Sequence, residues 1–191
     1  MILVWDLFVR IFHWSLVISF IIAYLSGEFS IMQLHLITGY AITALLFSRI
    51  LWGFIGSPYA RFKQFLQGPK RVSAYLFSIF RNTPTHYLGH NPAGGAMVIV
   101  LLILLTALVL TGFMTLALID FEGPFVDLLI HINDNISYLV QDTHHLLVNG
   151  LLVLILLHIV GVLAASKQHN ENLIKSMFTG YKKSLAPTSK K

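Results

Sequence analysis

The sequence predicts an all-α integral membrane protein, a four-transmembrane-helix bundle with both termini in the cytoplasm. Of the 191 residues, 56% are hydrophobic and only 11% are charged, whereas soluble domains contain about 25% charged residues. Four apolar segments reach the roughly 20 residues that a helix needs to cross a bilayer. They cover residues 4–26, 32–54, 93–119 and 143–166.

The charged residues are sorted between the two sides of these segments. All thirteen basic residues lie near the N-terminus, around the loop that joins the second and third segments, or after the fourth. Six of the eight acidic residues lie in the other two connections, which contain no base. Because basic loops remain in the cytoplasm, this pattern places both termini and the middle loop there, as expected in a bacterial inner membrane. The net charge of +5 therefore reflects topology, and nucleic acid is not an expected partner.

We expect one membrane domain over residues 1–180, followed by a flexible cytoplasmic tail over 181–191. The start, MILVWDLFVR, does not resemble a cleaved signal peptide, so the first helix is expected to be retained. The middle loop mixes bases with aromatic residues and is interrupted by Gly68-Pro69, which predicts short amphipathic segments on the lipid surface. The acidic connection contains FVDLLIHI, a candidate for a short interfacial helix.

Two histidines of the fourth segment lie on one face of its helix. His144 and His158 are fourteen residues apart, which at 3.6 residues per turn returns to within about 40° of the starting direction. The rise per residue separates them by roughly 21 Å along the helix. The adjacent His145 points about 140° away from His158, so it faces elsewhere.

Histidines on two other segments match this pair in depth. His13 lies in the cytoplasmic half of the first segment, at the level of His158, and His35 lies near the outer start of the second, at the level of His144. A histidine inside the membrane is costly unless it has a partner. Two imidazoles at one depth are what a bis-histidine b-type haem requires, because each side of the iron takes one neutral nitrogen. We therefore expect two haems, one between each pair.

The remaining polar residues fit this interpretation. Arg10 and Arg49 would neutralise haem propionates at the cytoplasmic rim. The chain has no cysteine, which excludes disulfides, iron–sulfur clusters and covalent c-type haem. Haems with both axial positions filled transfer electrons rather than bind substrate. The other histidines fall in loops, where a solvated or capping role is expected: His86, His90, His131 and His169.

Nearly the whole chain resembles the bacterial cytochrome b561 family, which overlaps with the cytochrome b subunits of membrane nickel-iron hydrogenases. The resemblance rests on VWDLFVRIFHW in the first segment, GHNPAGG before the third and THHLLVNGLLVLILLHIVGV in the fourth. It implies a four-helix bundle with two b haems, bound by His13 with His158 and by His35 with His144. The family usually has an acid or another residue after the first histidine of the fourth segment. Here His145 follows, and it stays open as an alternative ligand.

These features lead us to expect transmembrane electron transfer between the quinone pool and a periplasmic redox partner such as a c-type cytochrome. Arg10, Arg49 or His90 are candidates to hydrogen-bond a quinone carbonyl. A second hypothesis is the haem-bearing membrane anchor of a hydrogenase or another periplasmic dehydrogenase. A third is a haem-free transporter or proton channel with a histidine relay, although its broken helices are missing from the pattern. Membrane lipid is an expected partner, and a homodimer is compatible with the sequence.

Overall fold

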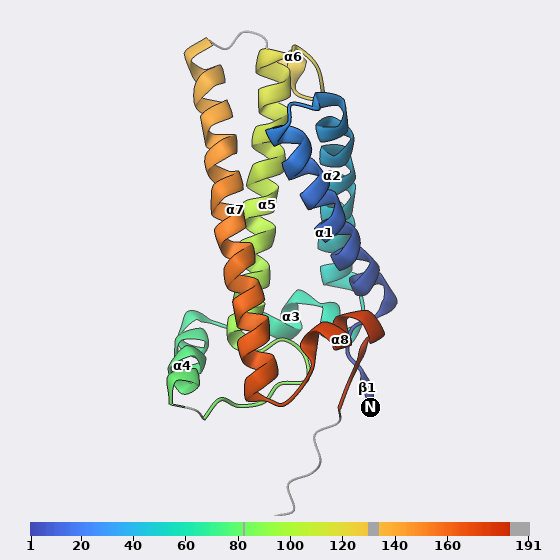
Figure 1. Cartoon of the computed structure of the whole chain (residues 1–191), viewed down its shortest axis with the longest axis vertical. Helices are drawn as coiled ribbons and strands as arrows, with labels where there is room; N and C mark the ends of the chain where they lie inside the picture. The colour runs from blue at the N-terminus through green and yellow to red at the C-terminus, as the bar shows by residue number, and fades with distance from the viewer. Residues whose placement is uncertain (82, 130–133, 184–191) are drawn as a thin grey trace, which may run out of the picture. The chain divides into compact units, whose positions relative to one another are not determined.

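The computed structural model describes residues 1–81, 83–129 and 134–183 and is mainly helical (Figure 1). Among the described residues, four helices are long and apolar enough to cross a membrane, which confirms the four predicted segments and a multi-pass membrane protein. They are α1 (Leu7–Glu28), α2 (Met32–Ile55), α5 (Pro92–Ile119) and α7 (Asp134–Gln168). The shorter elements are β1 (Ile2–Leu3), η1 (Pro58–Ala60), α3 (Phe62–Phe65), α4 (Pro69–Phe80), α6 (Val126–Leu129), α8 (Leu173–Thr179) and β2 (Tyr181–Lys182).

Two of the long helices begin at positions that differ from the hydropathy limits. Helix α1 begins at Leu7 and not at residue 4, because Asp6 caps it: its Oδ1 accepts the backbone N–H of Val9 at 2.8 Å. Helix α7 begins at Asp134, nine residues before the predicted start at 143. Hydropathy detects only the apolar part of a helix, so the polar first turns of α7 escape it.

The middle loop folds into short helices, as its composition predicts. Gly68 is the N-cap of α4, and Pro69 occupies its first turn, where a missing N–H costs nothing. Tyr75 of α4 is buried, whereas Lys70 and Arg71 are exposed. The glycine–proline pair therefore starts an amphipathic helix.

The chain divides into two compact units, of which the first contains residues 1–15, 47–99 and 157–191. In this unit β1 pairs with β2 in antiparallel register, Ile2 opposite Lys182 and Leu3 opposite Tyr181. Figure 1 shows α8, near the C-terminus, close in space to β1 at the N-terminus. Tyr181 and Lys182, expected in the tail, are therefore part of the folded unit; residues 184–191 lie outside the described part.

A small core holds this unit together around the N-terminus. Its buried members are Val4, Trp5, Val9 and Ala60. The Trp5 indole N–H donates to the Ser176 hydroxyl of α8 at 3.3 Å, across 171 positions of sequence. The N-terminal strand and the C-terminal helix thus stabilise one another.

The second unit contains residues 16–46 and 100–156. Its buried cluster, Ala117, Leu118 and Leu129, joins the end of α5 to α6. Helix α6 covers part of the interfacial helix expected in FVDLLIHI; residues 130–132 of that stretch lie outside the described part. Gly123 has a φ of +89° in the connection from α5 to α6, a conformation that glycine adopts without strain.

Candidate haem sites

The second unit brings together one of the predicted histidine pairs. His35, near the start of α2, and His144 of α7 are both half-buried, and their ring centroids are 6.3 Å apart with planes at 78°. An imidazole nitrogen binds a transition metal at about 2.0–2.1 Å, so two rings on opposite sides of one ion have centroids roughly 6–6.5 Å apart. The observed separation would let the two imidazoles hold one metal ion of a haem between them.

The hydrogen bonds of these rings determine which nitrogen is available to a metal. His35 Nδ1 lies 2.8 Å from the carbonyl oxygen of Ala23. His144 Nδ1 lies 3.1 Å from the hydroxyl of Thr111, which itself donates to backbone carbonyls of its own helix. Because a carbonyl, and a hydroxyl already donating, can only accept, both Nδ1 atoms carry the hydrogen. Each Nε2 therefore keeps its lone pair for a metal.

Both rings also lie against glycines of neighbouring helices. A Cβ built at Gly27 of α1 would be 3.1 Å from His35 Nδ1. A Cβ at Gly112 of α5 would be 3.2 Å from His144 Cε1. Both distances are shorter than the optimal carbon contact of about 3.5–4.0 Å. Glycine thus permits the close approach of each imidazole.

The first unit contains the other predicted pair, His13 of α1 and His158 of α7. Both side chains are half-buried, and His158 lies within electrostatic range of His13 and also of His90. His13 Nδ1 is shielded from solvent and has no hydrogen-bond partner among the described residues. Trp14 packs edge-on against the ring at 5.0 Å.

Two arginines in this unit carry donors that lack partners. Arg49 is only 4% exposed; its Nη2 donates to the carbonyl of Ala60 at 3.1 Å, and its guanidinium lies over the ring of Phe62. Arg10 Nη1 donates to the carbonyl of Phe178 at 2.6 Å. Within the described chain, Arg49 Nη1 and Arg10 Nε are buried without an acceptor. Buried donors of this kind require an acceptor, which the carboxylates of a haem would provide.

His90 is not the solvated loop residue that the sequence predicts. Its ring packs against Trp5 at 4.8 Å and Phe65 at 4.6 Å, and its Nδ1 is buried. Burial, and then the charge of Arg49, lower the pKa of His90 to about 3, so the imidazole is neutral at physiological pH. The motif GHNPAGG contains a signal that His90 has a fixed position. Asn91 caps α5 by accepting the N–H of Gly94 at 2.7 Å, and this cap fixes the backbone next to His90.

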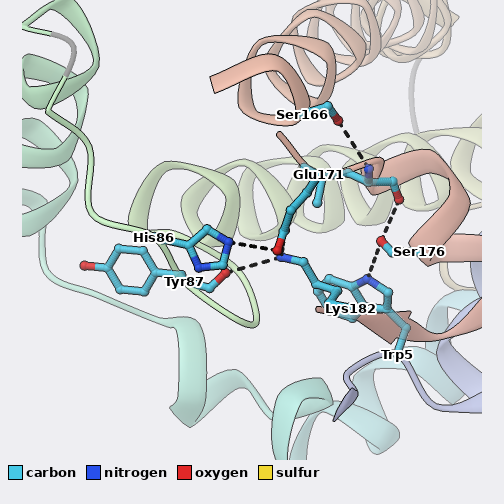
Figure 2. Close-up of polar contacts among 8 residues, drawn as sticks. Trp5, His86, Tyr87, Ser166, Glu171, Ser176 and Lys182 are labelled. Atoms are coloured by element: carbon cyan, nitrogen blue, oxygen red, sulfur yellow. Dashed lines mark hydrogen bonds and ion pairs between the residues drawn. The ribbon is translucent and has the colours of Figure 1, made fainter. Parts of the chain in front are cut away.

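Another loop histidine, His86, takes part in a polar cluster near the C-terminus (Figure 2). His86 Nε2 lies 2.9 Å from Glu171 Oε1, and Lys182 Nζ lies 3.0 Å from Glu171 Oε2. The rings of His86 and His169 are 4.9 Å apart. His145 is exposed, whereas His144 faces His35. His131 lies outside the described residues.

The fold defines a class: a multi-pass membrane protein that brings histidines of different helices together. The family described as prokaryotic cytochrome b561 matches residues 4–180, and the chain belongs to that family. It is 26% identical over 208 residues to a protein named probable Ni/Fe-hydrogenase B-type cytochrome subunit from Bradyrhizobium diazoefficiens. The match covers 90% of this chain and 82% of the relative. No solved structure matches the chain significantly.

Membership of this family establishes the general function of the chain, haem binding and electron transfer. The chain is a b-type cytochrome: it binds haem b in the membrane and transfers electrons across it. The haem-free transporter that the sequence left open does not agree with this assignment.

Proposed function

We propose that the chain carries two b-type haems, one between His35 and His144 and one between His13 and His158. The observation that carries the proposal is the first pair, with ring centroids 6.3 Å apart and a neutral nitrogen of each ring left free by the hydrogen bonds to Nδ1. The second site is supported by the half-buried positions of His13 and His158 in one unit, and by the buried Nδ1 of His13, which has no partner among the described residues. Haem supplies a one-electron iron couple, and the protein supplies its ligands and surroundings.

Arg10 and Arg49 are proposed to bind the propionates of the haem between His13 and His158. Each guanidinium already donates one hydrogen bond to a backbone carbonyl, which fixes its position. Each also has a buried nitrogen without an acceptor in the described chain. A carboxylate satisfies such a donor with a charge-assisted hydrogen bond.

Electrons are proposed to pass between the quinone pool and a periplasmic redox partner such as a c-type cytochrome. His144 and His158 stand on the same helix, α7, fourteen residues apart, so this helix contributes to both proposed sites. The charge segregation supports both termini in the cytoplasm of a bacterial inner-membrane protein. The exposed acids Asp120, Glu122 and Asp127 would then face the periplasm and attract a basic partner surface.

A second candidate is the membrane anchor of a hydrogenase or another periplasmic dehydrogenase. The Bradyrhizobium relative is named as a probable subunit of a Ni/Fe-hydrogenase, which favours this candidate. Purification of the tagged chain from its native membrane in mild detergent separates the two. A stoichiometric catalytic subunit that stays bound would support the anchor, whereas a chain that purifies alone and exchanges electrons with c-type cytochrome would support the first candidate.

The haem assignment is tested by optical spectra of the purified protein and by pyridine haemochrome analysis. We expect low-spin b-type bands in the reduced protein and two haems per chain. His144→Ala and His158→Ala should each remove one haem, and the two lost haems should differ in midpoint potential. His145→Ala is the matched control, because this neighbour is exposed, and it should keep both haems. Loss of a haem in His145→Ala but not in His144→Ala would contradict the proposed pairing.

A further inference from the structure

Thr111 of α5 has a hydroxyl whose hydrogen is already used. Its Oγ1 lies 2.9 Å from the carbonyl oxygen of Ala107 and 3.0 Å from that of Leu108, one turn earlier in the same helix. A threonine hydroxyl has a single hydrogen, and these two acceptors share it. The lone pairs on the same oxygen remain available, and His144 Nδ1 lies 3.1 Å away.

The direction of this hydrogen bond decides the chemistry of the imidazole. If the hydroxyl donated to Nδ1, the neutral ring would carry its hydrogen on Nε2, which could then not bind a metal. Because the hydroxyl donates to the backbone, it accepts the Nδ1–H instead, and Nε2 keeps its lone pair. Gly112 lies against Cε1 of the same ring. Thr111 and Gly112 therefore contact two adjacent ring atoms of His144, Nδ1 and Cε1.

We propose that Thr111 is a positioning residue for the haem bound by His144, fixing the tautomer and rotation of that ligand and lowering the midpoint potential of its haem. This rests on the proposed ligand role of His144. An acceptor on the far nitrogen makes an imidazole a stronger electron donor to its metal. A stronger donor favours the ferric state, which is why the hydrogen bond lowers the potential.

Comparison with the other two imidazoles shows why Thr111 is the position to substitute. His35 has an acceptor as well, but this is the backbone carbonyl of Ala23, which a substitution does not remove. His13 Nδ1 has no acceptor among the described residues. His144 has a hydrogen bond to the backbone of Leu108 and the contact with the Thr111 hydroxyl, and only the second belongs to a side chain that a substitution can change.

The experiment compares three variants of the full-length holoprotein in detergent. Thr111→Val keeps the shape and removes the hydroxyl acceptor, while the hydrogen bond of His144 to the backbone of Leu108 stays; Thr111→Ser keeps the hydroxyl. Thr106→Val is the control, because the Thr106 hydroxyl donates to the Leu102 carbonyl of the same helix at 2.7 Å. Each variant is examined by haem content, by optical redox titration and by low-temperature EPR of the ferric state, which reports the rotation of the axial rings.

We expect Thr111→Val to raise the midpoint potential of one haem by about 59 mV, which corresponds to a tenfold change in the equilibrium constant for one-electron reduction. The EPR signal of that haem should shift, and the second haem should stay unchanged. Thr111→Ser and Thr106→Val should resemble the wild type. Loss of one haem in Thr111→Val, with both haems kept in Thr111→Ser and Thr106→Val, would also support the positioning role.

Two results would overturn it: unchanged potentials and EPR in Thr111→Val, or equal shifts in Thr111→Val and Thr106→Val. His144→Ala is measured in parallel to separate this inference from the proposed function. If His144→Ala keeps both haems, the ligand assignment has failed. If it loses one haem while Thr111→Val changes nothing, only the role of Thr111 has failed.

Discussion

Gly112→Ala should weaken haem binding at His144 although it places a better helix former in α5. The new Cβ would lie 3.2 Å from Cε1 and 3.6 Å from Nδ1 of His144. Carbon atoms in contact prefer about 3.5–4.0 Å, so the imidazole must withdraw by about 0.3–0.8 Å. Its hydrogen bond to Thr111 is already 3.1 Å long and would pass the usual upper limit of about 3.2 Å.

The two consequences of this substitution have opposite signs. Alanine in place of glycine favours a helix by about 0.8–1.0 kcal/mol, so helix stability alone would make the variant more stable. Loss of a ligand's supporting hydrogen bond lowers metal affinity by about 10- to 100-fold. We expect a reduced content of one haem, measured by pyridine haemochrome after dilution and re-equilibration, and a raised midpoint potential for any of that haem retained.

Gly150→Ala in α7 is the matched control. A Cβ at Gly150 would meet Leu104 Cδ2 at 3.7 Å, an ordinary contact. This variant should keep both haems and both potentials while thermal stability is unchanged or higher. If Gly112→Ala behaves in the same way as Gly150→Ala, the inference that the glycine positions His144 is refuted.

Three further predictions concern the first unit. Asp6→Asn should lower stability to thermal unfolding by about 1–3 kcal/mol, because hydrogen bonds to a charged group, here including the indole N–H of Trp52 at 3.0 Å, are lost or weakened. Lys182→Ala should destabilise the unit by about 1.5–3 kcal/mol, because the half-buried Glu171 loses one charge-assisted hydrogen bond and keeps His86, whereas Lys183→Ala should have little effect. Burial raises the pKa of Glu171, but Lys182 and then His86 outweigh it and hold the pKa below its ordinary value of 4.5. The stabilisation is therefore complete above about pH 4.5 and is lost as the pH falls through the folded-state pKa, a dependence that Glu171→Gln should reduce in thermal scans at several pH values.

The membrane helices could be predicted from the sequence because their signals are local. Apolar runs and charged flanks mark a spanning segment without reference to the rest of the chain. The meeting of His35 and His144 was predictable for a related reason. Once the segments are fixed, helix phase and depth bring the two imidazoles to one level.

The surroundings of these histidines could not be predicted in the same way. Trp5 and Ser176 are 171 positions apart, and nothing in either stretch indicates that they form a hydrogen bond. His90 lies in a loop by pattern and is packed between two aromatic rings by tertiary structure. Helix α8 and the two short strands are too brief to produce a periodic signal. In each case the deciding contact is with a distant part of the chain.

The helices that provide no ligand to the His35–His144 site shape it in a common way. Helix α1 presents the carbonyl of Ala23 to His35, and the backbone of Gly27, one turn later, lies against the same ring. Helix α5 presents the hydroxyl of Thr111 to His144, and Gly112 follows directly. Each imidazole thus has an acceptor for its Nδ1–H and a glycine that lets it approach.

This division of roles has a consequence for how such a chain tolerates substitution. A histidine in a membrane helix is visible in the sequence, but an acceptor and a missing side chain on another helix are not. Conservative changes at Thr111 or Gly112 leave hydropathy and the number of histidines intact, yet under the proposed ligand role of His144 they would alter the nitrogen that its ring presents or the direction of the ring. Variants of these two positions should therefore insert and fold normally while the potential or occupancy of a single haem changes.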